Sequence, residues 1–316
     1  MHIVVACTDR KRVPVADDRQ LREVADADPK ARASRWWKRL QESPTLDLVY
    51  ARDLYAGEHW ATALKLPAAV QTAAPNARWW VASAGYGLVG WDAPLKSYSA
   101  TFAAGLDDSV ILTQPGGLSR APLLRSWWDQ ISSFAGPVDG APRRIADLAA
   151  AEPRGAVVVV ASPDYVRAME GDLLAARDRL DNPLRLVVVS NRAKLQAGPL
   201  ADHLVPVAQE AREVVGGTMQ GLNARVALAL LGKVENALFD ARTFQDLYAA
   251  MTRDAKTPQR PKGEPMTDDQ VIAFIKEQLV RDPKLAQTRL LRALRDAGRS
   301  CEQARFRGLY KRVAQA

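Results

Sequence analysis

Continuous runs of valine and other apolar residues, each followed by a loop, constrain the fold of this chain most strongly. Five such runs are typical of buried strands: residues 3–6, 79–82, 109–113, 156–161 and 185–189. Helical patterns alternate with them, at residues 58–74, 121–133, 164–179 and 221–238. Strands that are apolar on both faces and alternate with helices are typical of parallel sheets. The sequence therefore predicts an α/β fold with a mostly parallel sheet flanked by helices.

A segment rich in proline and charge interrupts this pattern toward the end of the chain. Residues 254–265, DAKTPQRPKGEP, contain three prolines, a glycine and charges of both signs, and such a composition cannot build a core. We therefore predict an α/β core over residues 1–240, a linker over 241–265 and a second domain over 266–316.

The second domain has the pattern of three short helices. Thr267 and Gln270 have the spacing of a capping box, and the apolar residues that follow suit one buried helix face. A second helix is predicted over 285–297 and stops at Gly298, and a third follows Ser300. Two helices joined by a turn that contains glycine are typical of the helix-turn-helix, so we expect a small all-α domain of this kind.

Basic residues are concentrated in this last domain. The chain has a net charge of +8, and only Asp296 and Glu302 oppose the positive charges after residue 283. Those positive charges are Lys284, Arg289, Arg292, Arg295, Arg299, Arg305, Arg307, Lys311 and Arg312. Gln303, Arg307 and Lys311 recur every four residues, which places them on one helix face. Arg305 and Arg312 flank this stripe, which suits the edges and phosphates of double-stranded DNA, although a solvated helix face has the same pattern.

Several classes of protein are not expected. The sequence has no run long enough to span a membrane and no signal-peptide pattern. Cys7 and Cys301 are far apart in sequence, which fits a reducing compartment, so we expect a cytoplasmic protein without a membrane partner. The three histidines share no metal spacing, and no glycine-rich nucleotide fingerprint is present, so neither a metal nor a cofactor is predicted.

One stretch does not read as ordinary packing. Residues 79–92, WWVASAGYGLVGWD, begin as a strand and then place two glycines around Tyr86. Other short motifs accompany this stretch in order along the chain: Cys7-Thr-Asp-Arg-Lys11, Ala51-Arg-Asp-Leu-Tyr55, Asp92 with Tyr98, Val160-Ala-Ser-Pro-Asp-Tyr165 and Gly216-Gly-Thr-Met-Gln-Gly-Leu-Asn-Ala-Arg225. In this order, over roughly residues 1–235, the chain resembles the YaaA-like superfamily of nucleic-acid-associated proteins.

The resemblance implies a core related to uracil-DNA glycosylases and a site built from these motifs. Cleavage of an N-glycosidic bond develops positive charge on the sugar, which a carboxylate can stabilise while it orients a water molecule. Asp53 and Asp92 are the candidate catalytic carboxylates. The candidate base-binding residues are Ser83, Tyr86, Trp91, Tyr98, Ser162 and Asn223, and Lys11, Arg12 and Arg225 are candidate DNA contacts.

Structural roles are open for the same residues. Asp53 has the position of a helix cap, Asp92 that of a turn residue, and Ser162 precedes a proline in the manner of a helix N-terminus.

The function predicted first is that of a DNA glycosylase. Such an enzyme would flip a modified or damaged base out of the stack and release it, leaving an abasic site. The resemblance implies a role in repair or in defence against phages whose DNA carries altered bases. A DNA-binding or stress-response protein without catalytic activity is the alternative, and an enzyme that acts on nucleotides before they enter DNA is a third hypothesis.

Overall fold

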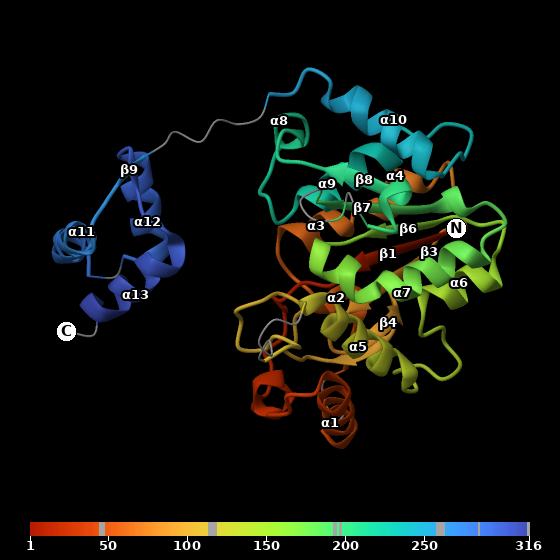
Figure 1. Ribbon diagram of the computed structural model, residues 1–316, viewed down its shortest axis with the longest axis horizontal. Coiled ribbons are helices and arrows are strands. Elements are labelled where there is room, and N and C mark those ends of the chain that lie inside the picture. Colours follow the sequence, from red (N-terminus) through yellow and green to blue (C-terminus); the bar gives the residue numbers. More distant parts are fainter. Residues whose placement is uncertain are drawn as a thin grey trace. The chain divides into compact units, whose positions relative to one another are not determined.

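A six-stranded sheet lies at the centre of the first of two units, Met1–Thr257, in the computed structural model (Figure 1). The structure describes residues 1–43, 48–112, 119–191, 195, 198–256, 263–283 and 285–314. The strand order is β4-β3-β1-β6-β7-β8, and all neighbours are parallel except β4, which is antiparallel to β3. The strands are β1 (His2–Ala6), β3 (Arg78–Ser83), β4 (Gly87–Gly90), β6 (Val157–Val160), β7 (Leu186–Asn191) and β8 (Leu204–Val207). The predicted α/β class is thus confirmed.

Helices cover both faces of the sheet, which explains why its central strands β1 and β6 are buried throughout (Figure 1). One face packs against α5 (Arg120–Ser133), α6 (Ile145–Ala151) and α7 (Pro163–Arg179). The other face is covered by α3 (Glu58–Ala63), α4 (Leu66–Val70), α9 (Leu222–Leu231) and α10 (Ala241–Thr252). The remaining elements are η1 (Asp17–Arg19), η2 (Leu21–Glu23), α1 (Pro29–Glu42), β2 (Leu48–Tyr50), α2 (Ala51–Leu54), β5 (Pro94–Lys96), η3 (Pro183–Arg185), η4 (Ala201–His203) and α8 (Ala211–Val215).

One predicted strand is wrong, and two strands of the sheet, β4 and β8, were not predicted. Within residues 109–112, Ser109 forms only an isolated bridge with Thr101, and residue 113 lies outside the described residues. Of these two strands, β8 contains Pro206. Proline lacks a donor for the ladder and is tolerated at a sheet edge, and β8 is the edge strand beside β7.

The predicted linker over 241–265 is wrong in its first part, because residues 241–252 form α10. The Asp240 side chain caps this helix by accepting a hydrogen bond from the backbone nitrogen of Thr243 at 2.9 Å. Phe244 and Tyr248 are buried in the same core as the central strands. The α/β unit therefore extends beyond residue 240, and residues 257–262 of the predicted linker lie outside the described residues.

Three helices with their own core form the second unit, which spans Pro258–Ala316. They are α11 (Asp268–Arg281), α12 (Gln287–Asp296) and α13 (Gln303–Ala314), as the sequence predicted. The predicted capping box at Thr267 and Gln270 is confirmed, with hydrogen bonds of 2.8 and 3.3 Å between the two residues. The unit is not purely helical, because β9 (Glu264–Pro265) pairs in parallel with β10 (Arg299–Ser300). Its core consists of Met266, Val271, Ile275, Leu290, Leu291, Leu294, Cys301, Phe306 and Leu309.

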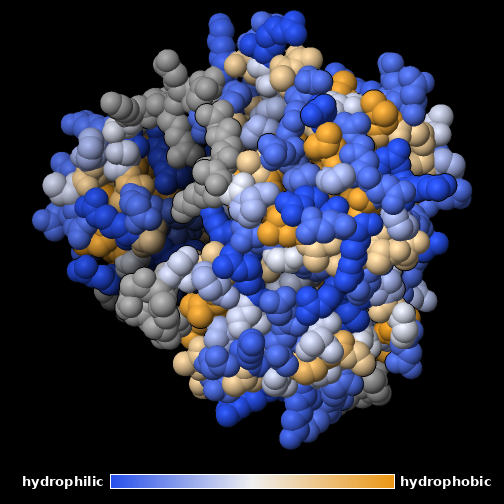
Figure 2. Space-filling model, turned by 45° about the vertical axis from the view of Figure 1, so that its right-hand side comes forward, coloured by the Kyte–Doolittle hydropathy of each residue, from blue (hydrophilic) through white to orange (hydrophobic). Residues whose placement is uncertain are grey.

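The face of the molecule in Figure 2 is mostly hydrophilic. Hydrophobic residues occur on it singly or in small groups rather than as one continuous patch. An ordinary surface of this kind does not by itself indicate a binding site.

Candidate functional site

A cavity of about 690 Å³ opens at the carboxyl edge of the central sheet. Its walls come from the loops that follow β1, β6 and β7, from the start of α3 and from the segment that leads into α9. The chain runs from β1 to β3 on one side and later to β6 on the other, so the direction of strand order reverses between β1 and β6. Open α/β sheets bind ligands at such a switch point. The volume lies within the usual range for small-molecule sites, about 300–1,000 Å³.

Three carboxylates lie in the wall of this cavity: Asp9, Glu58 and Asp164. Asp164 forms an ion pair with Arg167 at 2.8 Å, and Glu58 forms one with Arg225 at 2.7 Å. The Asp9 carboxylate forms no hydrogen bond or ion pair with the described residues, and its residue is exposed. Asp9 is therefore the acid in this wall whose oxygens are most available to a ligand or a water molecule.

Neutral polar groups complete the wall. Asn223 donates from Nδ2 to the Ala161 carbonyl at 2.8 Å, which fixes the amide at the end of β6. His59 lies 3.2 Å from the Ala6 carbonyl through Nε2, and that contact requires Nε2 to carry the proton. Burial lowers the pKa of His59 to about 4, so the imidazole is neutral at pH 7. Asn191 and Gln220 also line the cavity, which thus offers amides and a neutral imidazole beside its acids.

Behind the cavity lies a buried network of hydroxyl and thiol groups. Cys7 lines the cavity, and its sulfur lies 3.0 Å from the Tyr165 hydroxyl and 3.5 Å from that of Tyr98. The Tyr98 hydroxyl also lies 2.6 Å from Ser83 Oγ and 3.0 Å from the hydroxyl of Tyr55. Burial raises the pKa of the three tyrosines, so their hydroxyls stay protonated. The network gives the floor of the cavity a fixed geometry.

The stretch around Tyr86 is part of the core and does not line the cavity, contrary to the predicted base pocket. Ser83, Tyr86, Trp91 and Tyr98 are all buried, and Trp91 stacks on Trp60 with ring centroids 5.2 Å apart. The Tyr86 hydroxyl donates to the Lys96 carbonyl at 3.2 Å and accepts from its backbone nitrogen at 3.1 Å. These aromatic rings are already in contact with protein atoms and offer no face to a flipped base.

The two glycines of this stretch have packing reasons. A Cβ atom at Gly85 would lie 2.5 Å from a ring carbon of Tyr98, so only glycine lets the backbone approach that ring. Gly87 forms the turn between β3 and β4 with φ of 72°, in the left-handed region that favours glycine. The Arg143 guanidinium donates hydrogen bonds to the carbonyls of Tyr86 and Leu88, on either side of Gly87. The unusual sequence thus builds a buried hairpin.

The predicted catalytic carboxylates, Asp53 and Asp92, do not line the cavity. Both lie on the surface, where they flank the Arg52 side chain and pair with its guanidinium. Their side chains are 51% and 68% exposed, which leaves them solvated. The structure brings these two acids together at Arg52, but neither lines the carboxyl-edge cavity.

Two predicted base-binding residues do reach the cavity. Ser162 is exposed at the N-cap of α7, directly after β6, and Asn223 lies in the first turn of α9. Asp9, His59 and Asp164 were not proposed as site residues from the sequence. Asp9 and Asp164 could have been predicted as site residues, because each follows the carboxyl end of a Val-rich strand within one of the motifs of the resemblance.

The predicted DNA contacts of the first unit differ in availability. Arg12 is exposed. Arg225 is engaged by Glu58, and Lys11 is partly buried, with Nζ 4.5 Å from the centre of the Tyr98 ring and donating to the Asp9 carbonyl at 2.9 Å. Burial lowers the pKa of Lys11. Lys11 and Arg225 therefore stabilise the walls of the cavity rather than present free charges.

The predicted polar stripe of α13 is exposed as a whole. Gln303, Arg307, Lys311 and Arg312 have no hydrogen-bond or ion-pair partner among the described residues. Arg305 differs, because its guanidinium pairs with Asp268 at 2.5 Å and so connects α13 to the start of α11. Three of the four predicted cations of this helix are thus available to a polyanion.

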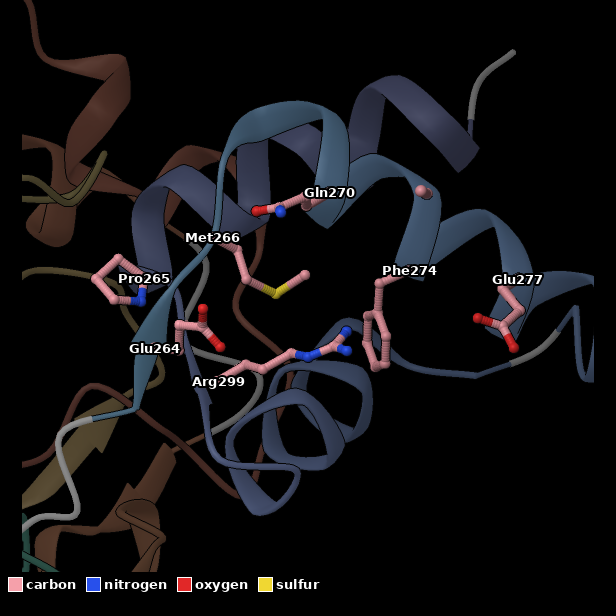
Figure 3. A pocket seen from close by; sticks show the side chains of 8 residues that line it. Glu264, Pro265, Met266, Gln270, Phe274, Glu277 and Arg299 are labelled. Atoms are coloured by element: carbon pink, nitrogen blue, oxygen red, sulfur yellow. The ribbon is translucent and has the colours of Figure 1, made fainter.

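A second cavity, of about 330 Å³, lies within the second unit (Figure 3). Phe274 of α11 and Arg299 of β10 point toward each other across it, with Met266 behind them (Figure 3). Glu264 and Glu277 lie at its sides. Its acidic rim is a poor surface for DNA, which favours α13 over this groove as the basic face of the unit.

In the part of the chain that the structure describes, no helix is long and apolar enough to cross a membrane. Among the described residues, no three His, Cys, Asp or Glu side chains form a group that could hold a metal ion. Comparison of the chain with family models, curated proteins and solved structures finds no match.

Proposed function

We propose that this protein is a DNA glycosylase that binds a flipped, modified or damaged base in the carboxyl-edge cavity and hydrolyses its N-glycosidic bond. The observation that carries the proposal is the position of the Asp9 carboxylate. It stands without a protein partner among the described residues, in the wall of a cavity of nucleoside-compatible size at the switch point of the sheet.

The chemistry follows from the residues of the wall. A water molecule adds to the sugar carbon, the glycosidic bond breaks, and the electron pair of that bond leaves with the base. Asp9 is suited to orient the water, accept its proton and stabilise the positive charge that develops on the sugar. The amides of Asn223 and Gln220 are suited to hydrogen-bond the edge of the base, and the neutral His59 adds no charge to repel it.

The second unit supplies the DNA-binding part of the proposal. Arg307, Lys311 and Arg312 lie on a short helix of a compact three-helix unit and are exposed. In this proposal α12 and α13 act as a helix-turn-helix and α13 contacts the duplex. The proposal also assigns the first unit to the YaaA-like, uracil-DNA-glycosylase-related proteins, on the order of the motifs and the open sheet.

The test is to incubate the full-length protein with genomic DNAs that carry different base modifications. Released bases are identified by mass spectrometry, and abasic sites by strand breakage in alkali. Release of one kind of base with an equal number of abasic sites supports the proposal. Tight DNA binding without release from any DNA would contradict it and favour the non-catalytic, DNA-binding alternative.

A further inference from the structure

The segment that joins α8 to α9 forms one wall of the carboxyl-edge cavity. Within residues 216–221, Met219 and Gln220 line the cavity, and the helix that follows brings in Asn223. Two consecutive glycines open this segment, Gly216 with φ of 67° and Gly217 with φ of 79°. A loop with such a backbone needs external contacts to hold one conformation.

Glu58, at the start of α3, supplies these contacts. Its two carboxylate oxygens accept hydrogen bonds from the backbone nitrogen of Thr218 at 3.0 and 3.2 Å. One of them also accepts from Nε of Arg225 at 2.7 Å. The carboxylate thus connects α3 at once to the loop and to the helix that follows it. We name this group of Glu58, Thr218 and Arg225 the clasp.

In the clasp, both carboxylate oxygens of Glu58 accept hydrogen bonds. The hydrogen bond from the Thr218 backbone, together with the hydrogen bond from the Arg225 side chain, lowers the pKa of Glu58 to about 2, although burial acts in the opposite direction. A carboxylate held in this way is a poor proton acceptor at neutral pH. Glu58 therefore lines the cavity without being suited to act as the general base.

Glycine at position 217 is required by the same contacts. A Cβ atom there would lie 2.1 Å from Nε of Arg225 and 2.2 Å from Oε1 of Glu58. Any side chain at this position would displace the ion pair. The loop backbone and the clasp therefore fit each other closely.

We propose that Glu58 is a positioning residue that holds the 216–221 loop in place, and with it Gln220 and Asn223 as the base-contacting wall of the cavity. The role of that wall in base recognition rests on the proposed function. The fixing of the loop does not, since it follows from the contacts of the clasp alone.

The variant that tests this inference is Glu58→Gln, which keeps the shape of the side chain and removes its charge. The matched control is Glu170→Gln. Glu170 pairs with Arg125 at 2.6 Å, and the side chains of that pair are 26% and 35% exposed. The corresponding values in the clasp are 27% and 34%. Both variants thus lose one half-buried ion pair, but only Glu58→Gln changes the loop.

The first measurement is hydrogen–deuterium exchange of residues 216–221 in the full-length protein. Hydrogen bonds to charged groups stabilise more than neutral ones do, so exchange at Thr218 is expected to rise about tenfold in Glu58→Gln. It should stay unchanged in Glu170→Gln. Equal exchange in wild type and Glu58→Gln would overturn the inference. Gly217→Ala provides a second route to the same result, because it displaces the clasp without changing its charges.

The second measurement is the rate of base release, with the DNA from which the wild type releases base fastest as the substrate. A displaced wall should raise KM at least about tenfold in Glu58→Gln, with a smaller change in kcat, because Asp9 and its water are untouched. A fall in kcat alone would contradict a positioning role. If the wild type releases no base from any DNA, the proposed function fails, and the exchange result alone decides whether Glu58 fixes the loop.

Discussion

Gly85→Ala offers a strict test of how the hairpin around Tyr86 is built. The added methyl group would lie 2.5 and 2.6 Å from two ring carbons of Tyr98, well inside van der Waals contact. The ring has no room to move, since Tyr98 is fully buried and its hydroxyl contacts Ser83, Tyr55 and Cys7. The backbone at Gly85 is not in the left-handed region, so the expected cost comes from overpacking alone.

The magnitude follows from general values for buried sites. Overpacking a close-packed core costs about 1–3 kcal/mol, and the rigid surroundings of Tyr98 favour the upper end of that range. For a unit of about this size, each kcal/mol lowers the melting temperature by about 2–4 °C, so we expect a fall of about 6–12 °C. The control is Gly90→Ala in the same hairpin, where a methyl group would meet no atom within 4 Å.

Tryptophan fluorescence is the suitable assay, because all eight tryptophans lie between residues 36 and 128 and so report on the first unit alone. A melting curve of the full-length protein then gives the transition of that unit. Gly90→Ala should melt within about 2 °C of the wild type, as expected for a change without a steric cause. Equal melting temperatures for the two variants would refute the packing argument.

Two further predictions concern the second unit and acid. The double variant Arg307→Ala, Lys311→Ala should weaken DNA binding and reduce the log–log salt slope by about two, since each lost phosphate contact removes about one. Arg305→Ala should change the slope less, because Arg305 pairs with Asp268. Equal salt slopes for the wild type and the double variant would show that the polar stripe of α13 is a solvated helix face. Burial lowers the pKa of His2 and of His59 from 6.5 to about 4, so the folded state resists protonation that the unfolded chain accepts below pH 6.5. The free energy of unfolding should therefore fall as the pH drops from 6.5 toward 4, by up to about 3 kcal/mol for each histidine. Urea titrations at several pH values measure this loss, and an unchanged slope against pH in His59→Gln would contradict the role of that residue.

The sequence was sufficient for four strands of the sheet, β1, β3, β6 and β7, because their signals are local. The strands β1, β6 and β7 each contain three or four consecutive buried residues of the types Val, Ile and Leu, and burial on both faces of a sheet favours such runs. Thr267 likewise predicted the start of α11 correctly, because a capping box acts within one helical turn. α10 was not predicted, because residues 241–252 were assigned to the linker together with the proline-rich segment that follows them.

The candidate site was less predictable because it depends on contacts between distant parts of the chain. The sequence could not show that Tyr98 fills the space beside Gly85 and so places the whole hairpin in the core. Nor could it show that Asp53 and Asp92 are exposed and form ion pairs with Arg52. Asp9 lies in the polar loop after β1, at the carboxyl end of a strand, where open α/β sheets bind ligands.

The central claim is that Asp9, in the carboxyl-edge cavity, activates water for base release. The measurement that tests it most directly compares single-turnover base release by Asp9→Asn and Asp53→Asn, after fluorescence and DNA binding have shown that both variants fold and bind. Loss of a positioned general base costs about 10²–10⁴-fold in rate, so Asp9→Asn should release base at least about a hundred times more slowly than the wild type. Asp53→Asn, which changes a solvated acid outside the cavity, should stay within about twofold of the wild type, in line with the small effects of exposed ion pairs. The opposite pattern, with Asp9→Asn active and Asp53→Asn inactive, would contradict the account and return the chemistry to the surface beside Arg52.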